Sequence, residues 1–168
     1  MLDQTPVQIA WVTNDLTATE TTLSALLGVP RWFRMPGVHF APDTCTYRGE
    51  PADCVADISL SYAGDMQLEV IAPTSGDSVY SEFLERCGPG LHHICRDVGD
   101  ADAFTAALDE AAHRGAPAVM VGTMPGGMRF AYLSAPESGV PYLEIAYLPP
   151  EIRAYFSHLK DQVNQEQN

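Results

Sequence analysis

Two adjacent histidines in an apolar segment are the first residues of this chain that could carry out chemistry. The segment GPGLHHICRDVGD, residues 88–100, is typical of a buried strand and contains His92 and His93. Successive side chains of a strand point to opposite faces, so at most one of these imidazoles can share a cavity with neighbouring strands. His93 corresponds to Gln8 at an offset of 85 residues, as shown below, which selects His93 for the cavity. We expect His92 to pack beneath a helix.

Two glutamates also lie within apolar strands. Glu69 stands in MQLEVIAP and Glu144 in VPYLEIAYL, and alternation turns their apolar neighbours to the opposite face. An ionised carboxylate in a dry core costs several kcal/mol. Each glutamate therefore needs a metal ion, a cationic partner or water.

The elements that must position these residues form two similar halves. An apolar strand over residues 7–13 leads to Asp15 and a helix that ends at Gly28, and a strand over residues 91–98 leads to Asp100 and a helix that ends at Gly115. Asp15 follows Gln8 by seven residues, as Asp100 follows His93. Strand-like runs follow each helix, at residues 31–35, 54–62 and 66–72 in the first half and at 116–121, 128–135 and 140–148 in the second. Each half is therefore predicted to be a βαβββ module.

The remaining segments are assigned by their composition. Residues 36–51 are predicted to be a long loop, and residues 74–89 a linker with one short helix in VYSEFLER. A helix is expected over IRAYFSHLKDQ, after which VNQEQN is expected to fray. The prediction is a single domain over residues 1–168, with modules at about 6–73 and 90–149 and a C-terminal helix and tail at 150–168.

Composition excludes several classes of partner. Asp and Glu total 22 against 9 Lys and Arg, and a formal charge of −13 would repel a nucleic acid. No apolar stretch approaches the roughly 20 residues of a membrane span, and no cationic segment precedes an apolar run. The four cysteines include no CxxC pair and are expected to be reduced thiols. We therefore expect a cytoplasmic protein that binds neither nucleic acid nor membranes.

Paired βαβββ units, with a ligand-type residue on the first strand and a carboxylate on the last strand of each, resemble the vicinal oxygen chelate superfamily. The resemblance covers nearly the whole chain. It implies an α+β fold in which the two modules form a cupped, partly open mixed sheet around a central cavity, with helices on the outside. The four metal-binding positions of the superfamily fall on Gln8, Glu69, His93 and Glu144. These residues are thereby implied to hold a divalent ion, which could be Zn, Ni, Co, Mn, Mg or Fe.

The combination of Gln, Glu, His and Glu is chemically reasonable for such an ion. One imidazole nitrogen, an amide oxygen and two carboxylates suit a borderline or hard divalent cation. Glyoxalase I enzymes of the eukaryotic type use the same set, and methylmalonyl-CoA epimerases use a close variant. Extradiol dioxygenases need two histidines, so a set with His93 alone argues against dioxygen chemistry.

The resemblance also implies a reaction. A metal ion that holds a carbonyl oxygen stabilises the enolate formed when a neighbouring C–H is deprotonated. Glu144 is the first candidate for the base, and Glu69 is the second. The expected enzyme is an isomerase, an epimerase or a glyoxalase-type lyase that acts on a small molecule such as an acyl thioester or a 2-oxo compound. A homodimer is also expected.

Aromatic and sulfur-containing side chains are candidates for the walls of the substrate site. Arg129, beside Gly126 and Gly127, could pair with a substrate carboxylate or phosphate, although a plain hairpin explains this segment equally well. The loop at residues 36–51 is expected to determine specificity. The predicted substrate contacts are Trp32, Phe40, Tyr47, Met128, Arg129 and Tyr132.

Two other functions remain open at this point. The same cupped sheet in bleomycin-resistance-like proteins binds a small molecule without a metal and without turnover. A metal-free isomerase could instead use Glu144 or His93 directly.

Overall fold

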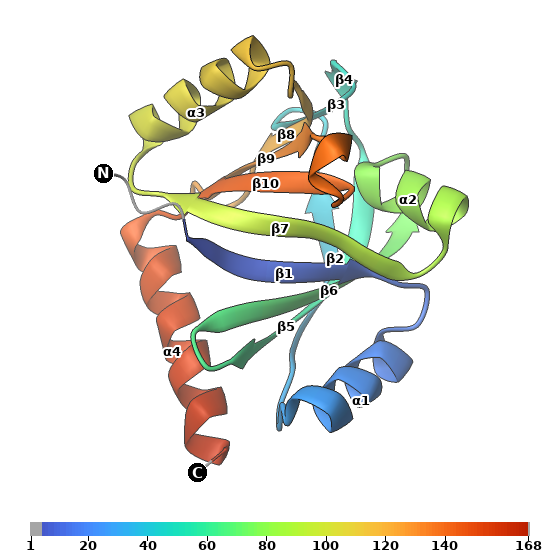
Figure 1. Cartoon of the computed structure of the whole chain (residues 1–168), viewed down its shortest axis with the longest axis vertical. Coiled ribbons are helices and arrows are strands. Elements are labelled where there is room, and N and C mark those ends of the chain that lie inside the picture. Colours follow the sequence, from blue (N-terminus) through green and yellow to red (C-terminus); the bar gives the residue numbers. More distant parts are fainter. Residues whose placement is uncertain (1–4, 168) are drawn as a thin grey trace.

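Ten strands among residues 5–167, the part of the chain that the computed structural model describes, form one curled mixed sheet (Figure 1). The domain expected over residues 1–168 includes residues 1–4 and 168, which lie outside this range. Along the sheet the strands follow the order β2-β5-β6-β1-β7-β10-β9-β8-β3-β4. Their bounds are β1 Pro6–Val12, β2 Phe33–Phe40, β3 Cys45–Tyr47, β4 Glu50–Pro51, β5 Cys54–Ala63, β6 Met66–Ser75, β7 Gly90–Val98, β8 Ala118–Thr123, β9 Arg129–Ser134 and β10 Tyr142–Tyr147.

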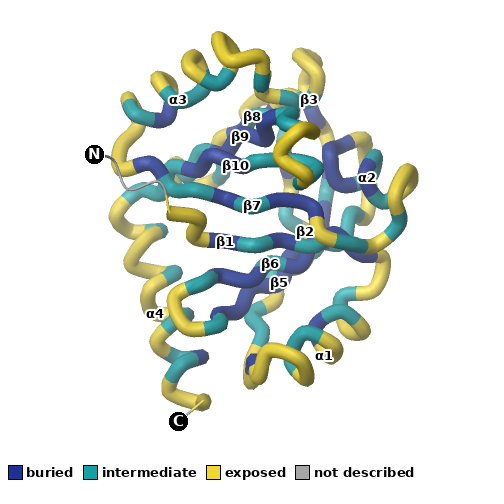
Figure 2. The backbone as a smooth tube through the Cα atoms, viewed as in Figure 1, coloured by how far each residue is buried: buried dark blue, intermediate teal, exposed yellow. Residues whose placement is uncertain are grey.

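The centre of the sheet is where the two halves of the chain meet. The first strands of the two halves, β1 and β7, pair antiparallel, and each also pairs in parallel with the last strand of its own half, β6 or β10. Each of these four strands contributes buried positions to the middle of the molecule (Figure 2). The cupped mixed sheet built from two βαβββ modules is thereby confirmed.

Helices α1 (Leu16–Leu27) and α3 (Ala101–His113) follow β1 and β7 and cover the outer face of the sheet. Asp15 and Asp100 cap them by accepting hydrogen bonds from the amides of Ala18 and Ala103. Helix α3 buries Phe104 completely against residues from β7, β9 and β10. The apolar face expected for α1 is less complete, since Leu26 is 76% exposed. The buried residue of α1 is Glu20, which forms an ion pair with Arg34.

The segment at residues 36–51 was expected to be a loop, and this prediction is wrong. It forms most of β2 together with β3 and β4. Strand β3 pairs with β8 of the second half, with Cys45 opposite Gly122. Only residues 41–44 therefore connect β2, at one edge of the sheet, to β3 near the other edge. Across this narrow gap Phe40 packs edge-to-face on Phe130, so the sheet nearly closes around its interior.

Two helices bound the interior of the curled sheet. Helix α2 (Val79–Cys87) begins with a capping box at Ser78 and buries Tyr80 and Phe83. Helix α4 (Pro150–Glu166) lies along β5, where it buries Leu159 and Val163 beside Tyr62 (Figure 1). The expected fraying over VNQEQN is wrong for residues 163–166, which continue α4 with Val163 completely buried, whereas Asn168 lies outside the described residues. A short 3-10 helix at Pro136–Ser138 precedes β10.

None of the helices within residues 5–167 is both long enough and apolar enough to cross a membrane.

Candidate active site

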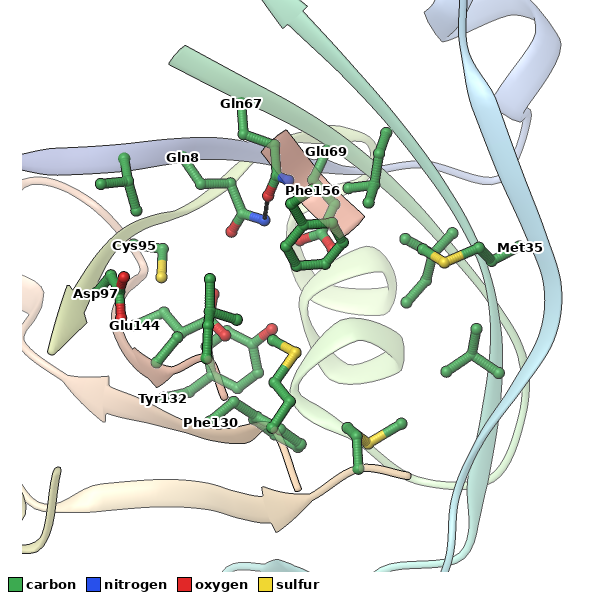
Figure 3. Close-up of a pocket in the computed structure, with 18 of the residues that line it drawn as sticks. Gln8, Met35, Gln67, Glu69, Cys95, Asp97, Phe130, Tyr132, Glu144 and Phe156 are labelled. Atoms are coloured by element: carbon green, nitrogen blue, oxygen red, sulfur yellow. Dashed lines mark hydrogen bonds between the residues drawn. The ribbon is translucent and has the colours of Figure 1, made fainter. Parts of the chain in front are cut away.

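The curled sheet, α2 and α4 enclose a cavity of about 260 Å³ (Figure 3). Polar groups line one part of it, and apolar side chains form most of the rest. The polar lining residues are Gln8, Gln67, Glu69, Tyr80, Cys95, Asp97, Tyr132 and Glu144. The larger apolar ones are Met35, Phe40, Leu60, Met124, Met128, Phe130 and Phe156.

The four residues implied as metal ligands lie on the four neighbouring central strands. Gln8 is on β1, Glu69 on β6, His93 on β7 and Glu144 on β10. Ala10 of β1 stands opposite both Glu69 and His93, so alternation brings Gln8 to the same face as these two residues.

Three oxygen atoms from these residues converge on one nitrogen. His93 Nε2 lies 3.0 Å from Glu144 Oε2, 3.4 Å from Glu69 Oε2 and 3.2 Å from Gln8 Oε1. The structure therefore brings together all four side chains that the sequence selected. Within residues 5–167, no group of three or more His, Cys, Asp or Glu side chains forms a ready metal-binding arrangement, and here the oxygens contact the imidazole nitrogen itself.

The charges of these groups depend on one another. Complete burial disfavours a charged imidazole and would lower the pKa of His93. The negative charges of Glu144 and Glu69 and their hydrogen bonds to His93 outweigh burial, with Glu144 contributing most, and raise this pKa to about 9. Burial also raises the pKa of Glu69, although contact with His93 opposes this shift. Without a bound cation, the imidazolium form of His93 therefore balances the buried carboxylates.

His92 contacts the opposite side of the His93 ring. His92 Nε2 lies 3.2 Å from the carbonyl oxygen of Val79, and the two Nδ1 atoms are 2.8 Å apart. Burial holds the pKa of His92 well below its usual range, so this ring is neutral. A carbonyl only accepts, so Nε2 of His92 donates to Val79, and Nδ1 of His92 then accepts from His93. This relay leaves Nε2 of a neutral His93 free to bind a cation.

The contact between the two imidazoles departs from simple strand alternation. The β1–β7 ladder pairs Ala10 with His93 and Trp11 with Leu91, so His92 is an extra residue in the strand. Such a bulge turns side chains away from strict alternation. His92 does pack against α2 as expected, with Phe83 edge-to-face at 5.1 Å, but its ring also meets His93.

A second relay orients Gln8. The Gln8 amide nitrogen donates to Gln67 Oε1 at 2.7 Å, and the Gln67 amide nitrogen donates to the Tyr62 hydroxyl at 2.7 Å. Because the Gln8 nitrogen is occupied in this way, its oxygen faces His93. Figure 3 shows the bond between the two glutamines above the carboxylate of Glu144.

Two buried phenols stand beside the carboxylates. The hydroxyls of Tyr80 and Tyr132 are 2.8 Å apart, and the Tyr132 ring packs edge-to-face on His93 at 4.9 Å. Burial and the nearby negative charges hold the pKa of both tyrosines well above the usual range. Both therefore keep their protons. Since one hydroxyl donates to the other, the pair has one proton left for a ligand in the cavity.

The structure divides the predicted substrate contacts into two groups. Phe40, Met128 and Tyr132 line the cavity, whereas Trp32, Tyr47 and Arg129 do not.

The three outside residues are held elsewhere by specific partners. Trp32 donates to Ser24 of α1 on the outer face, and Tyr47 donates to Glu82 of α2. The Arg129 guanidinium lies over the ring of Phe104, 4.4 Å from its centre, beneath α3. Gly126 and Gly127 form the turn between β8 and β9, each with a φ of 85°. These placements favour the plain-hairpin interpretation, and the three residues are not carried forward as substrate contacts.

Sequence reasoning missed the contributions of the two inner helices. Tyr80 of α2 and Phe156 of α4 both line the cavity; the sequence predicts a helix at each position but assigns neither helix to the site. Cys95 and Asp97 also line it, as their alternation with His93 predicts. Burial raises the pKa of the Cys95 thiol well above its ordinary value, so it stays protonated.

Comparisons with known proteins identify the family and the fold. A family model described as the Glyoxalase/Bleomycin resistance protein/Dioxygenase superfamily matches residues 7–132. No curated protein sequence matches the chain.

Solved structures share the fold at low sequence identity. Methylmalonyl-CoA epimerase from Mycobacterium tuberculosis superposes with a TM-score of 0.62 at 19% identity, covering 92% of this chain and 97% of the epimerase. A methylmalonyl-CoA epimerase in complex with methylmalonyl-CoA and NH4+ gives 0.58 at 18% identity, with 89% and 97% covered. A hypothetical protein from Bacillus halodurans gives 0.59 at 17% identity, with 88% and 96% covered.

Proposed function

Because the chain belongs to the glyoxalase, bleomycin resistance protein and dioxygenase superfamily, we propose that it is an epimerase-like enzyme that acts on a small carbonyl compound. Its reaction would remove and return a proton on the carbon beside the carbonyl group, as an isomerase, an epimerase or a glyoxalase-type lyase does. One observation carries the proposal. Oxygens of Gln8, Glu69 and Glu144 converge on His93 at the polar part of an otherwise apolar cavity.

The donor set suits a divalent cation. An imidazole nitrogen, an amide oxygen and two carboxylates match the ligands of borderline and hard divalent ions, and the two relays already orient Gln8 and His93. Gln8, Glu69, His93 and Glu144 would hold the ion. When bound, it would supply positive charge for the oxygen that becomes negative as the C–H bond is broken.

The side chains of the protein supply the rest of the chemistry. Glu144 is the proposed base, and Glu69 is the second candidate, since both carboxylates reach the cavity. The Tyr80–Tyr132 pair would donate its remaining proton in a hydrogen bond to the substrate oxygen. The apolar walls would exclude water. The contact of the base with the substrate proton and the hydrogen bond from the tyrosine pair are both stronger when water is excluded.

Deuterium exchange tests the proposal. Glu144→Gln should abolish exchange of the substrate α-proton with deuterated water, measured by NMR, and should leave ligand binding within a few-fold of the parent chain. Glu110→Gln, on the outer surface of α3, is the matched control and should exchange normally. Full exchange by Glu144→Gln would exclude Glu144 as the base.

Metal analysis tests the proposed ion separately. Protein purified without chelator should contain about one divalent ion per chain, and His93→Ala should lose it. Equal metal content in the two proteins would exclude the proposed ligand set.

A metal-free binding protein is the second candidate, and the mainly apolar lining favours it. It would bind a small molecule in the cavity without α-proton exchange.

The homodimer and the cytoplasmic location also remain proposals. Sedimentation of the purified chain tests the first, and fractionation of the source cells tests the second.

A further inference from the structure

We propose that the cavity takes an uncharged, apolar carbonyl compound that carries neither a phosphate nor a free carboxylate. The inference that the ligand contains a carbonyl group rests on the function proposed above. The apolar and uncharged character is inferred independently, from the cavity walls and from the positions of the basic side chains.

Lysine and arginine are absent from the cavity wall formed by the described residues. Of the side chains in residues 5–167 that line it, none belongs to lysine or arginine, whereas three carry carboxylates: Glu69, Asp97 and Glu144. A ligand anion would enter beside these groups with no basic side chain to neutralise it, and Glu69 and Glu144 would already balance the charge of the proposed divalent ion. Burying such an unpaired charge is costly, so the wall selects against anions.

The nine lysine and arginine residues offer no free charge to the cavity. All nine lie within the described residues, and seven of them form ion pairs with carboxylates of the same chain. The other two are Arg129, which lies over Phe104, and Arg96. Arg96 stands on β7 between two cavity-lining residues, Cys95 and Asp97, so alternation turns it to the other face.

Arg153 of α4 comes nearest to serving an anionic ligand. Its guanidinium forms an ion pair with Asp97, which lines the cavity, and also donates to the carbonyl oxygen of Leu148. A ligand carboxylate would have to displace Asp97, an acceptor that is already fixed in place. Arg153 therefore neutralises Asp97 and leaves no charge for a ligand.

The remaining wall fits an apolar group. Met35 comes from β2, Met128 and Phe130 from the β8–β9 hairpin and β9, and Phe156 from α4 (Figure 3). Methionine and phenylalanine offer adaptable apolar contact and no hydrogen-bond donors for phosphate. Because the polar lining groups include the Tyr80–Tyr132 pair with its remaining proton, the carbonyl end of a ligand would face this pair and its apolar end would face the apolar side chains.

Methylmalonyl-CoA, the ligand of one structural neighbour, combines a free carboxylate with the phosphates of coenzyme A. Neither group has a basic partner in the cavity of the present chain. We therefore propose that the present chain does not bind this class of ligand, although it shares the fold of the epimerase.

Three probes, each with a C–H beside a thioester carbonyl, separate these chemical features. They are 2-methylhexanoyl-N-acetylcysteamine, which is uncharged, 2-methylhexanoyl-CoA, which adds phosphates, and methylmalonyl-N-acetylcysteamine, which adds a carboxylate. Isothermal titration of the full chain should show that the uncharged thioester binds at least tenfold more tightly than either charged probe. Equal or tighter binding of a charged probe would overturn the proposal, as would no binding of the uncharged one.

A pair of variants on α4 tests whether the apolar wall contacts the apolar end of the ligand. Phe156→Ala should weaken binding of the uncharged thioester about fivefold to tenfold. Tyr155→Ala removes the neighbouring ring, which is 48% exposed and is not part of the lining, and should leave binding unchanged. Equal effects of the two variants would contradict the assignment of the apolar end to this wall.

The same probes distinguish failure of this proposal from failure of the proposed function. Tight binding of the uncharged thioester without α-proton exchange would support the ligand class and exclude the enzyme. Exchange of the methylmalonyl thioester alone would support the enzyme and overturn the ligand class.

Discussion

At the scale of single residues, the site depends on side chains that never touch the reacting atoms. His92 links the backbone of α2 to His93, and Gln67 links Tyr62 to Gln8. The first relay turns Nε2 of His93 toward the centre of the site, and the second turns the amide oxygen of Gln8 toward it. Partners of this kind commonly change metal affinity 10-fold to 100-fold when they are removed.

His92→Phe should therefore lower the affinity for Co²⁺ about 10-fold to 100-fold, because Nδ1–H of His93 loses its acceptor and the ring is no longer fixed. A competing chelating dye measures this affinity. His92→Gln, whose amide oxygen can accept the same bond, should restore part of it. Unchanged affinity in His92→Phe would show that the relay has no such role.

The Tyr80–Tyr132 pair leads to a prediction that concerns two residues at once. Replacing both with phenylalanine should slow α-proton exchange about 100-fold, while each single variant retains one hydroxyl and should lose less. The double variant should unfold at nearly the same denaturant concentration as the parent, since both members of a buried pair are removed together. Normal exchange by the double variant would exclude the pair from the reaction.

At the scale of elements, the pairing of β3 with β8 brings a segment of the first half to the far edge of the sheet. Gly122 on β8 permits this approach. A Cβ at this position would lie 2.5 Å from Phe130 Cε1 and 2.6 Å from Cys45 Sγ, closer than such atoms can come.

Gly122→Ala should destabilise the protein by about 1–3 kcal/mol, because Phe130 or Cys45 must move. Denaturant unfolding measures this change. Gly99→Ala is the control, since a Cβ there meets nothing within 4 Å, and its effect should stay within about 0.5 kcal/mol. Equal effects of the two variants would show that the contact at Gly122 is not tight.

The elements also show what the sequence could and could not predict. Local alternation predicts the central strands, and the Asp caps predict α1 and α3. The strand positions of Gln8, Glu69, His93 and Glu144 also predict that these side chains lie together. Residues 36–51 were predicted to be a loop because Pro36, Gly37 and Pro51 interrupt the segment, β3 and β4 are short, and the pairing of β3 with β8 is a long-range contact. Similarly, the end of α4 depends on Val163 packing against Tyr62, about a hundred residues away.

The bulge at His92 and the cavity contacts of Tyr80 and Phe156 could not be predicted for the same reason. Each depends on which distant strand or helix lies opposite, and the periodicity of a segment does not contain that information.

At the scale of the whole molecule, an ion-pair cluster connects the β3–β4 turn to α2. Glu82 accepts hydrogen bonds from Arg48, Tyr47 and Arg86, and these bonds, chiefly that from Arg48, lower the pKa of Glu82 to about 2. A group whose pKa is lower in the folded state stabilises the protein above its unfolded pKa, near 4.3.

Glu82→Gln should therefore cost about 1 kcal/mol at pH 7, a modest value because both arginines are mostly exposed to solvent. The difference from the parent should shrink as pH falls from about 4.5 toward 2, where Glu82 is protonated. Urea unfolding across this range measures it. Glu85→Gln removes a charge from the same helix and should show no comparable trend; a similar trend would point to net charge as the cause.

Helix α4 also determines when the cavity closes during synthesis. Phe156 and the Arg153 partner of Asp97 belong to this helix, and β10 directly precedes it, whereas β1, β6 and β7 are translated much earlier. A nascent chain folds from its N-terminus onward. The first half of the sheet can therefore form on the ribosome while the cavity is still open, and the cavity closes only when β10 and α4 have emerged together.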